Sequence, residues 1–205
     1  MKILLIALLL SLFAFTQPNS NTNTTVSLII SSSVNIKVKS NVNSFNCKSS
    51  TNYRHDTLYV KYEKEDNIYS VENAFLEIDL NGFNCGNPLV NKDFATLLQT
   101  DTYPTIKIYI GQIMLNEMKA GNRSGKVDYD IEIAGIKKHF ETKFSSSVTN
   151  GKRLVQGELA MSLSDFNLKP PKKLLGLIKV SDEILIEFHY LIEKTSIVQD
   201  FYHLK

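Results

Sequence analysis

Apolar and polar residues alternate strictly along many segments of this 205-residue chain, and this pattern constrains the fold more than any other feature. The clearest example is 127–133, where Val, Tyr, Ile and Ile alternate with Asp, Asp and Glu. Because successive side chains of a β-strand point to opposite faces, each such segment predicts a strand with one buried face. The same period recurs in 34–38, 58–62, 76–80, 106–110, 159–163 and 184–192.

Short turn sequences separate these predicted strands. They lie at 65–67, 120–122, 134–135 and 149–151 and contain the Asn, Asp or Gly residues that suit hairpin turns. Hairpins make consecutive strands antiparallel, and few helical segments remain that could build parallel crossovers. The pattern therefore indicates a β-sandwich or a closed β-barrel.

One short helix is expected between residues 87 and 99. Val90, Phe94 and Leu97 fall on one face of this segment, and Pro88 suits its first turn. The segment is too short and isolated to change the all-β class.

The chain opens with the charged, apolar and polar order of a secretory signal. Lys2 precedes an apolar run at 3–15, which is shorter than the roughly 20 residues that a membrane-spanning helix needs. Residues 1–16 are therefore expected to be a signal peptide whose removal places the protein in the periplasm or outside the cell. Residues 17–33 begin with a run rich in Asn, Ser and Thr and are expected to be flexible. Residues 34–205 are expected to form one domain.

Composition narrows the choice of partners. Apolar residues make up 43% of the chain, enough for a sizeable core, and a formal net charge of +2 gives no broad electrostatic reason to expect nucleic acid. The chain has two cysteines, Cys47 and Cys85, and export favours a disulfide between them. Two separate buried thiols are the alternative.

No segment carries a recognisable catalytic or metal-binding pattern. The four histidines form no His-x-His or His-Glu-x-x-His pair, and the cysteines form no Cys-x-x-Cys pair. Gly-x-Ser-x-Gly and glycine-rich phosphate loops are also absent. Neighbouring carboxylates such as Asp128 and Asp130 share an outward strand face, where solvation is the simpler interpretation. The sequence therefore predicts neither an enzyme nor a cofactor or metal.

Three stretches occur in an order that resembles the YceI-like family. They are Asn-Lys-Asp-Phe at 91–94 followed by Tyr-Pro-Thr-Ile at 103–106, then Asp-Ile-Glu-Ile-Ala-Gly at 130–135, and then Ser-Leu-Ser-Asp-Phe-Asn-Leu at 162–168. The resemblance extends from about residue 34 to residue 192.

This resemblance implies an all-β fold, namely an eight-stranded antiparallel lipocalin-like β-barrel with one or two short helices. It also implies that a polyisoprenoid or a similar fatty-acid-like lipid is held inside the barrel. An eight-stranded barrel is just wide enough to be filled by side chains or to hold one slim ligand. The inward residues expected to line such a lipid site are Ile36, Val38, Leu76, Ile78, Ile106, Ile108, Tyr129, Ile131, Met161, Phe166, Ile186 and Phe188.

Three lysines flank a Pro-Pro pair in a predicted loop at 169–176. Lys169, Lys172 and Lys173 most simply belong to a solvated surface. The sharper hypothesis is a cationic rim that meets a charged head group, or that makes a transient contact with a membrane surface.

Two functions stay open at this point. The first is an exported carrier or store for an apolar lipid. The second is a structural or stress-related interaction protein whose barrel is filled by side chains. The pattern leaves the oligomeric state open.

Overall fold

The computed structural model of the chain describes residues 22–49, 56–72, 74–116, 122–173 and 177–195. Strands dominate these residues, with one α-helix and two short 3-10 helices between them. In chain order the elements are β1 (Thr22–Ser40), β2 (Ser44–Ser49), β3 (Asp56–Glu65), β4 (Ile68–Glu72), β5 (Phe75–Asp79), η2 (Leu80–Gly82), β6 (Phe83–Asn84), α2 (Pro88–Leu98), β7 (Thr105–Asn116), β8 (Arg123–Ile133), β9 (Ile136–Thr149), β10 (Lys152–Ser162), η3 (Leu163–Phe166), β11 (Lys172–Lys173) and β12 (Ile178–Thr195).

Two-residue turns build the hairpins that the sequence predicts. Ala134 and Gly135 connect β8 to β9 with φ values of 48° and 76°, and Asn150 and Gly151 connect β9 to β10 with φ values of 51° and 73°. Two successive positive φ angles match the turns whose twist suits an antiparallel pair. The turn predicted at 120–122 lies partly outside the described residues.

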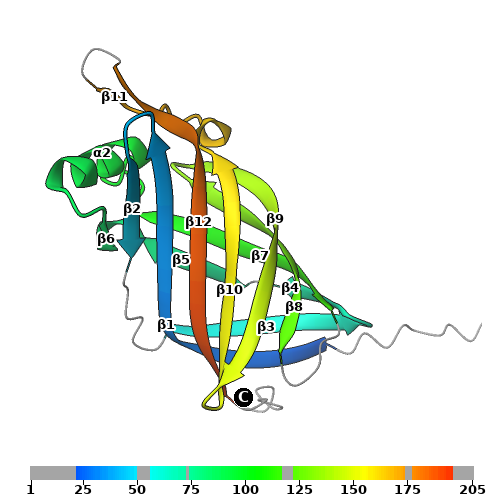
Figure 1. Cartoon of the computed structure of the whole chain (residues 1–205). Helices are drawn as coiled ribbons and strands as arrows, with labels where there is room; N and C mark the ends of the chain where they lie inside the picture. The colour runs from blue at the N-terminus through cyan, green and yellow to red at the C-terminus, as the bar shows by residue number, and fades with distance from the viewer. Residues whose placement is uncertain (1–21, 50–55, 73, 117–121, 174–176, 196–205) are drawn as a thin grey trace, which may run out of the picture.

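The twelve strands of the described residues form one antiparallel sheet. Its order is β11-β12-β10-β9-β8-β7-β4-β3-β1-β2-β6, and β5 pairs with β7. Figure 1 shows the long strands curving around a shared interior. The all-β antiparallel class with a short helix is therefore confirmed, whereas the closed barrel of eight strands stays a prediction.

The long strand β1 links several parts of the sheet. It pairs along one edge with β12 and along the other edge first with β3 and then with β2. β1 begins at Thr22, so most of the segment 17–33, predicted to be flexible, belongs to a strand. The reason is that pairing uses backbone groups, so polar residues can join a sheet when a strand is available on each side.

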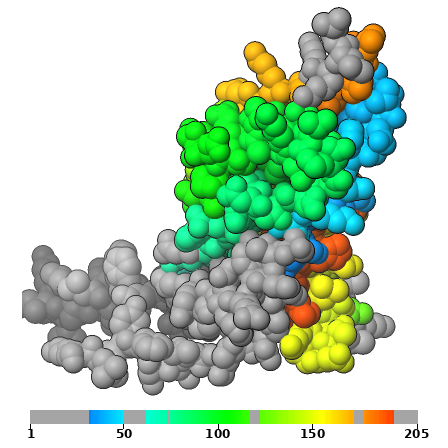
Figure 2. Space-filling model, turned by 90° about the vertical axis from the view of Figure 1, so that its left-hand side faces the viewer, coloured from blue at the N-terminus to red at the C-terminus, as the bar shows by residue number. Residues whose placement is uncertain are grey.

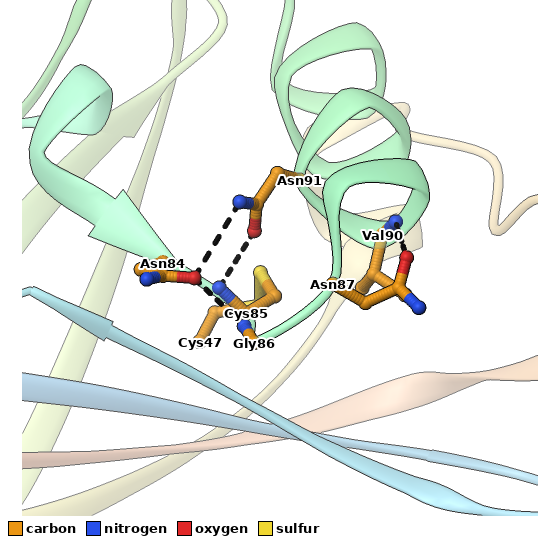
Figure 3. The surroundings of a disulfide bond; sticks show 7 residues. All are labelled: Cys47, Asn84, Cys85, Gly86, Asn87, Val90 and Asn91. Carbon is orange, nitrogen blue, oxygen red and sulfur yellow. Dashed lines mark hydrogen bonds between the residues drawn. A yellow bond between two sulfur atoms is a disulfide. The ribbon is translucent and has the colours of Figure 1, made fainter.

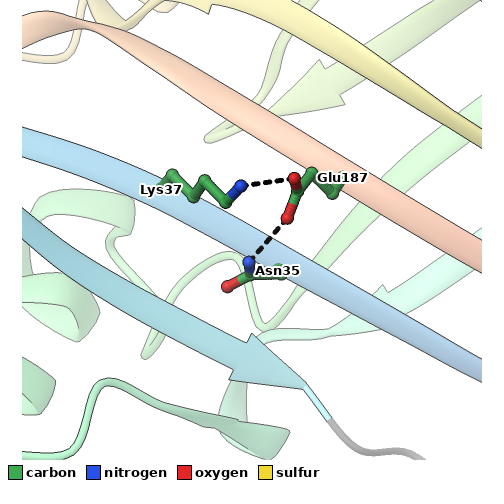
Figure 4. A network of polar contacts seen from close by, with 3 residues as sticks. All are labelled: Asn35, Lys37 and Glu187. Carbon is green, nitrogen blue, oxygen red and sulfur yellow. Dashed lines mark hydrogen bonds and ion pairs between the residues drawn. The ribbon is translucent and has the colours of Figure 1, made fainter.

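A polar link joins β1 to β12 on the outer side of the sheet (Figure 4). Lys37 Nζ donates to Glu187 Oε1, and Asn35 Nδ2 donates to Glu187 Oε2 at 2.8 Å. These hydrogen bonds hold the pKa of the Glu187 carboxyl below its ordinary value, and the one from Lys37 has the largest effect. The link reinforces the backbone pairing of Asn35 with Glu187.

α2 has a defined start and end. The Asn87 side chain accepts hydrogen bonds from the first turn, Pro88 begins the helix, and Gln99 follows Leu98 in the left-handed conformation. The helix predicted at 87–99 is therefore confirmed. In Figure 2, α2 and its neighbouring segments, in green, form a broad part of the visible surface below the orange segment. Among the described residues, no helix is long and apolar enough to cross a membrane.

A disulfide ties β2 to the segment that leads into α2 (Figure 3). It joins Cys47 to Cys85, which are 2% and 8% exposed. Beside it, the backbone N–H of Cys85 donates to Asn91 Oδ1 at 2.7 Å, which connects α2 to the same place. The bridge that export favours is present, and the alternative of two separate thiols is wrong.

Candidate functional site

A β-bulge in β7 determines which side chains face the interior. The inward residues are even-numbered up to Ile110 and odd-numbered from Ile113, because the register shifts between them. The backbone N–H of Gln112 donates to Asp128 Oδ1 on β8. A Cβ at Gly111 would lie 2.7 Å from that oxygen, so glycine leaves room for this contact. The bulge lets β7 present apolar residues inward along its whole length.

The interior of the sheet contains an elongated cavity of about 420 Å³. This volume lies within the range of about 300–1,000 Å³ that is usual for ligand pockets. β8 lines the cavity from its first residue, Arg123, to its last, Ile133, a span of about 33 Å at about 3.3 Å per residue. The lining residues are Val34, Ile36, Tyr62, Tyr69, Val71, Leu76, Ile78, Phe83, Ile106, Ile108, Ile110, Ile113, Leu115, Arg123, Val127, Tyr129, Ile131, Ile133, Phe144, Ser146, Arg153, Val155, Leu159, Ile186, Phe188, Tyr190 and Ile192.

One end of the interior is packed with side chains instead. Phe166 of η3 is 1% exposed, and its ring stacks on Phe140 of β9 with centroids 6.1 Å apart. Leu163, Leu168 and Met161 are buried in the same core cluster. The hydroxyl and backbone N–H of Ser164 both donate to the Asp182 carboxylate, which attaches η3 to β12. Side chains around η3 therefore fill part of the interior at this end, beside the cavity wall that Ile133 and Leu159 provide.

Most of the residues predicted to line a lipid site do border the cavity. Nine of the twelve are among its lining residues, and Val38, Met161 and Phe166 are not. Met161 and Phe166 belong to the packed end, and Val38 packs against the core from a partly buried position. Whether any of the twelve contacts a lipid stays a prediction.

The cavity wall is apolar or aromatic except at three residues. These are Arg123, Ser146 and Arg153, which come from β8, β9 and β10. Arg153 Nη1 donates to Ser146 Oγ at 2.7 Å. Burial lowers the pKa of the Arg153 guanidinium, and the charge of Arg123 lowers it further.

Tyr129 of the wall forms a buried hydroxyl pair with Thr142 behind it. Tyr129 Oη and Thr142 Oγ1 lie 2.6 Å apart, and the two residues are 7% and 4% exposed. Burial raises the pKa of the Tyr129 phenol, and the hydrogen bond with Thr142 opposes that rise. The phenol therefore stays neutral and points no free polar group into the cavity.

Sequence reasoning missed more than half of the lining residues. Continuing the period of two would have found Val127 and Ile133 on β8, since they share the parity of Tyr129. The same parity places Arg153 beside Val155 and Leu159, yet charged residues are usually assigned to the surface. Predicting that Ile113 and Leu115 face inward requires knowing of the bulge. The only sequence signal for that bulge is Gly111, which breaks the alternation.

Of the lysines of the predicted loop, Lys169 is described with its side chain, and it does not line the cavity. Lys169 is exposed, and the side chains of Lys172 and Lys173 lie outside what the structure describes. Their backbone forms β11, which pairs with residues 178–179 of β12 where a loop was expected. Their role with a head group stays a prediction.

The described residues contain no group of three or more His, Cys, Asp or Glu side chains that could bind a metal ion. His139 pairs with a single carboxylate, its Nδ1 lying 3.0 Å from Asp130 Oδ1 on the surface.

An antiparallel sheet curved around a long apolar cavity defines a class of β-proteins with an internal ligand-sized space. Within this class, a family model for the YceI-like domain matches residues 19–191. The chain belongs to the YceI-like family, and the resemblance seen in its sequence is confirmed.

A solved structure shares the fold at low sequence identity. A polyisoprenoid binding domain from Saccharophagus degradans, implicated in plant cell wall breakdown, is 15% identical with a TM-score of 0.58. That match covers 83% of this chain and 98% of the other. BcnA from Burkholderia cenocepacia is 16% identical with a TM-score of 0.45, covering 82% and 95% of the two chains. A search of curated proteins found no match.

Proposed function

We propose that the protein is an exported binding protein that holds one long apolar lipid, such as a polyisoprenoid, inside a closed β-barrel. The observation that carries this proposal is the elongated cavity of about 420 Å³ with its almost wholly apolar wall. Removing apolar surface from water is favourable by about 25 cal/mol per Å², before the costs of association are subtracted. A lipid chain is the ligand class that such a wall suits best.

The strand pairings support a barrel of eight strands. β1 pairs with β3 on one side and with β12 on the other, and the remaining members follow in the order β10, β9, β8, β7 and β4. All eight of these strands contribute residues to the cavity wall. A barrel of this size has room for one small ligand, which agrees with a single slim chain.

The fold comparison adds support for the ligand class. The Saccharophagus degradans domain, whose fold this chain shares, is a polyisoprenoid binding domain. The hollow interior favours this function over a filled barrel that acts only through its surface. No catalytic step is part of the proposal.

Export completes the proposed role. The secretory signal expected at residues 1–16 would place a soluble lipid carrier or store in the periplasm or outside the cell. A disulfide between Cys47 and Cys85 suits that compartment, because disulfides persist under oxidising conditions.

Lipid occupancy can be tested directly with a substitution that fills the cavity. Ile108 is half-buried and lines the cavity, so Ile108→Trp should enter empty space, lower the melting temperature little and strongly reduce bound lipid. Native mass spectrometry followed by lipid extraction measures occupancy. The matched control is Ala160→Trp, which adds the same bulk to an exposed position on the outer face of β10.

Two results would contradict the proposal. Wild-type protein could emerge without lipid and take up neither isoprenoids nor fatty acids. Alternatively, Ile108→Trp and Ala160→Trp could retain the same amount of lipid as the wild type.

A further inference from the structure

The polar residues of the cavity wall are concentrated at one place. Arg123 begins β8 and pairs across the sheet with Ser146 of β9, which in turn pairs with Val155 of β10. Arg153 is the second residue of β10 and donates to Ser146 Oγ at 2.7 Å. We call Arg123, Ser146 and Arg153 the arginine cluster. It lies beside the β9–β10 turn, at the end of the sheet opposite α2 and β11 (Figure 1).

Among the described side chains, the cluster carries two positive charges without a compensating acid. The ion pairs seen among the described residues include Lys37 with Glu187 and Lys126 with Glu141, and neither arginine takes part in them. Arg153 is only half-exposed and borders an apolar space, where an unpaired charge is unfavourable. The mutual repulsion of the two guanidinium groups adds to this cost. An anion placed between them would remove both penalties.

The geometry points to a specific mode of anion recognition. Guanidinium groups bind carboxylate and phosphate oxygens with paired, charge-assisted hydrogen bonds. Ser146 is 5% exposed and accepts a hydrogen bond from Arg153, which leaves its own O–H free to donate. Arg123 is exposed as well as part of the wall, so this end of the cavity reaches solvent. A charged head could therefore stay near water while its chain extends along the apolar wall.

We infer that the lipid held by this protein carries an anionic head group, a carboxylate or a phosphate, and that Arg123, Arg153 and Ser146 bind it. This inference rests on the proposed lipid-binding function and adds the chemistry and the orientation of the ligand. It places the head at the β9–β10 end and the tail toward the packed Phe166. The lysines near β11 then have no part in recognising the head group.

Three probes with the same alkyl chain test the inference, namely hexadecanol, palmitate and hexadecyl phosphate. Displacement of a neutral fluorescent alkyl probe from the delipidated full chain gives their relative affinities. We expect the wild type to bind at least one acidic probe about tenfold or more tightly than the alcohol. Palmitate and hexadecyl phosphate separate a fatty acid from a lipid phosphate as the preferred class.

The variants then assign the preference to the cluster. Arg123→Gln/Arg153→Gln should reduce the affinity for the acidic probes to about that of hexadecanol and leave hexadecanol within about twofold of the wild type. The matched control Lys169→Gln should leave all three affinities unchanged. If the double variant does not fold, the wild type still tests the inference, because added salt should weaken the binding of the acidic probes and not that of the alcohol.

Three results would contradict the head-group inference or the lipid-binding function on which it rests. Wild-type protein that binds all three probes equally overturns the head-group inference and leaves lipid binding intact. If the double variant loses affinity for hexadecanol and for the acidic probes by the same factor, the head-group inference is also wrong, because the arginines would then be structural. If none of the three probes binds, hexadecanol included, the proposed lipid-binding function itself is wrong.

Discussion

At the scale of single residues, the Tyr129–Thr142 hydroxyl pair shows how polar groups are accommodated in an apolar wall. Each hydroxyl lies in a residue that is less than one-tenth exposed, and each has the other as its partner at 2.6 Å. A buried hydroxyl without a partner would be unfavourable, so the pair allows a polar aromatic ring to line the cavity.

Removing one member of this pair should therefore cost more than removing both. Tyr129→Phe leaves the Thr142 hydroxyl without this partner, and we expect a loss of about 1–2 kcal/mol in the free energy of unfolding. Tyr129→Phe combined with Thr142→Val removes both polar groups and should recover part of that loss. Urea denaturation of the lipid-free protein measures both values. A double variant less stable than the single variant would contradict this explanation.

At the scale of elements, glycines and aromatic residues alternate across four neighbouring strands. Gly125 of β8 pairs with Phe144 of β9, which pairs with Gly157 of β10, which pairs with Phe188 of β12. A Cβ at Gly157 would lie 2.5 Å from the Phe188 ring and 2.8 Å from the Lys143 carbonyl oxygen. Each glycine thus makes room for the aromatic ring of its neighbour, and both rings line the cavity.

A single added methyl group tests this arrangement. Gly157→Ala should destabilise the protein by about 1–3 kcal/mol, because the Lys143 backbone cannot move aside easily. The control is Gly82→Ala, whose Cβ would lie at an ordinary 3.6 Å from Ser49 Oγ and should change stability little. Thermal unfolding of the two variants provides the comparison. Equal melting temperatures of Gly157→Ala and Gly82→Ala would show that the Phe188 ring does not require a glycine at position 157.

The elements also differ in how far the sequence could predict them. The hairpins at 134–135 and 149–151 depend on local turn residues, and α2 depends on Asn87, Pro88 and an apolar face, so both were found. The first half of β1 was assigned to a flexible segment because its pairing partners, β3 and β12, are distant in the chain. The bulge in β7 shifts the inward face by one residue, and a strict period of two does not include that change.

For the molecule as a whole, alternation predicted the apolar wall but not where the wall encloses empty space. Ile108 and Met161 have the same inward pattern in the sequence, yet Ile108 borders the cavity and Met161 is buried in the core away from it. That difference depends on Phe166 filling one end, which requires the fold of the entire chain. The arginine cluster was missed for the same reason, because Arg123 and Arg153 meet only when β8, β9 and β10 lie side by side.

If one part of the interior is packed and another is hollow, replacing a phenylalanine by alanine should cost different amounts of unfolding free energy in the two parts. Phe166 is 1% exposed and stacks on Phe140, so Phe166→Ala should open a new cavity in a filled core and cost about 3–5 kcal/mol. Phe188 is half-buried and already borders empty space, so Phe188→Ala removes fewer contacts and should cost about 1–2 kcal/mol.

Urea denaturation of the lipid-free protein, with the Cys47–Cys85 disulfide intact in both variants, is the measurement that compares them. A bound lipid would stabilise the native state by mass action and obscure the difference, which is why it must be removed first. Similar losses from Phe166→Ala and Phe188→Ala would mean that both ends are packed alike. The cavity, and the lipid-binding function proposed from it, would then lose their main support.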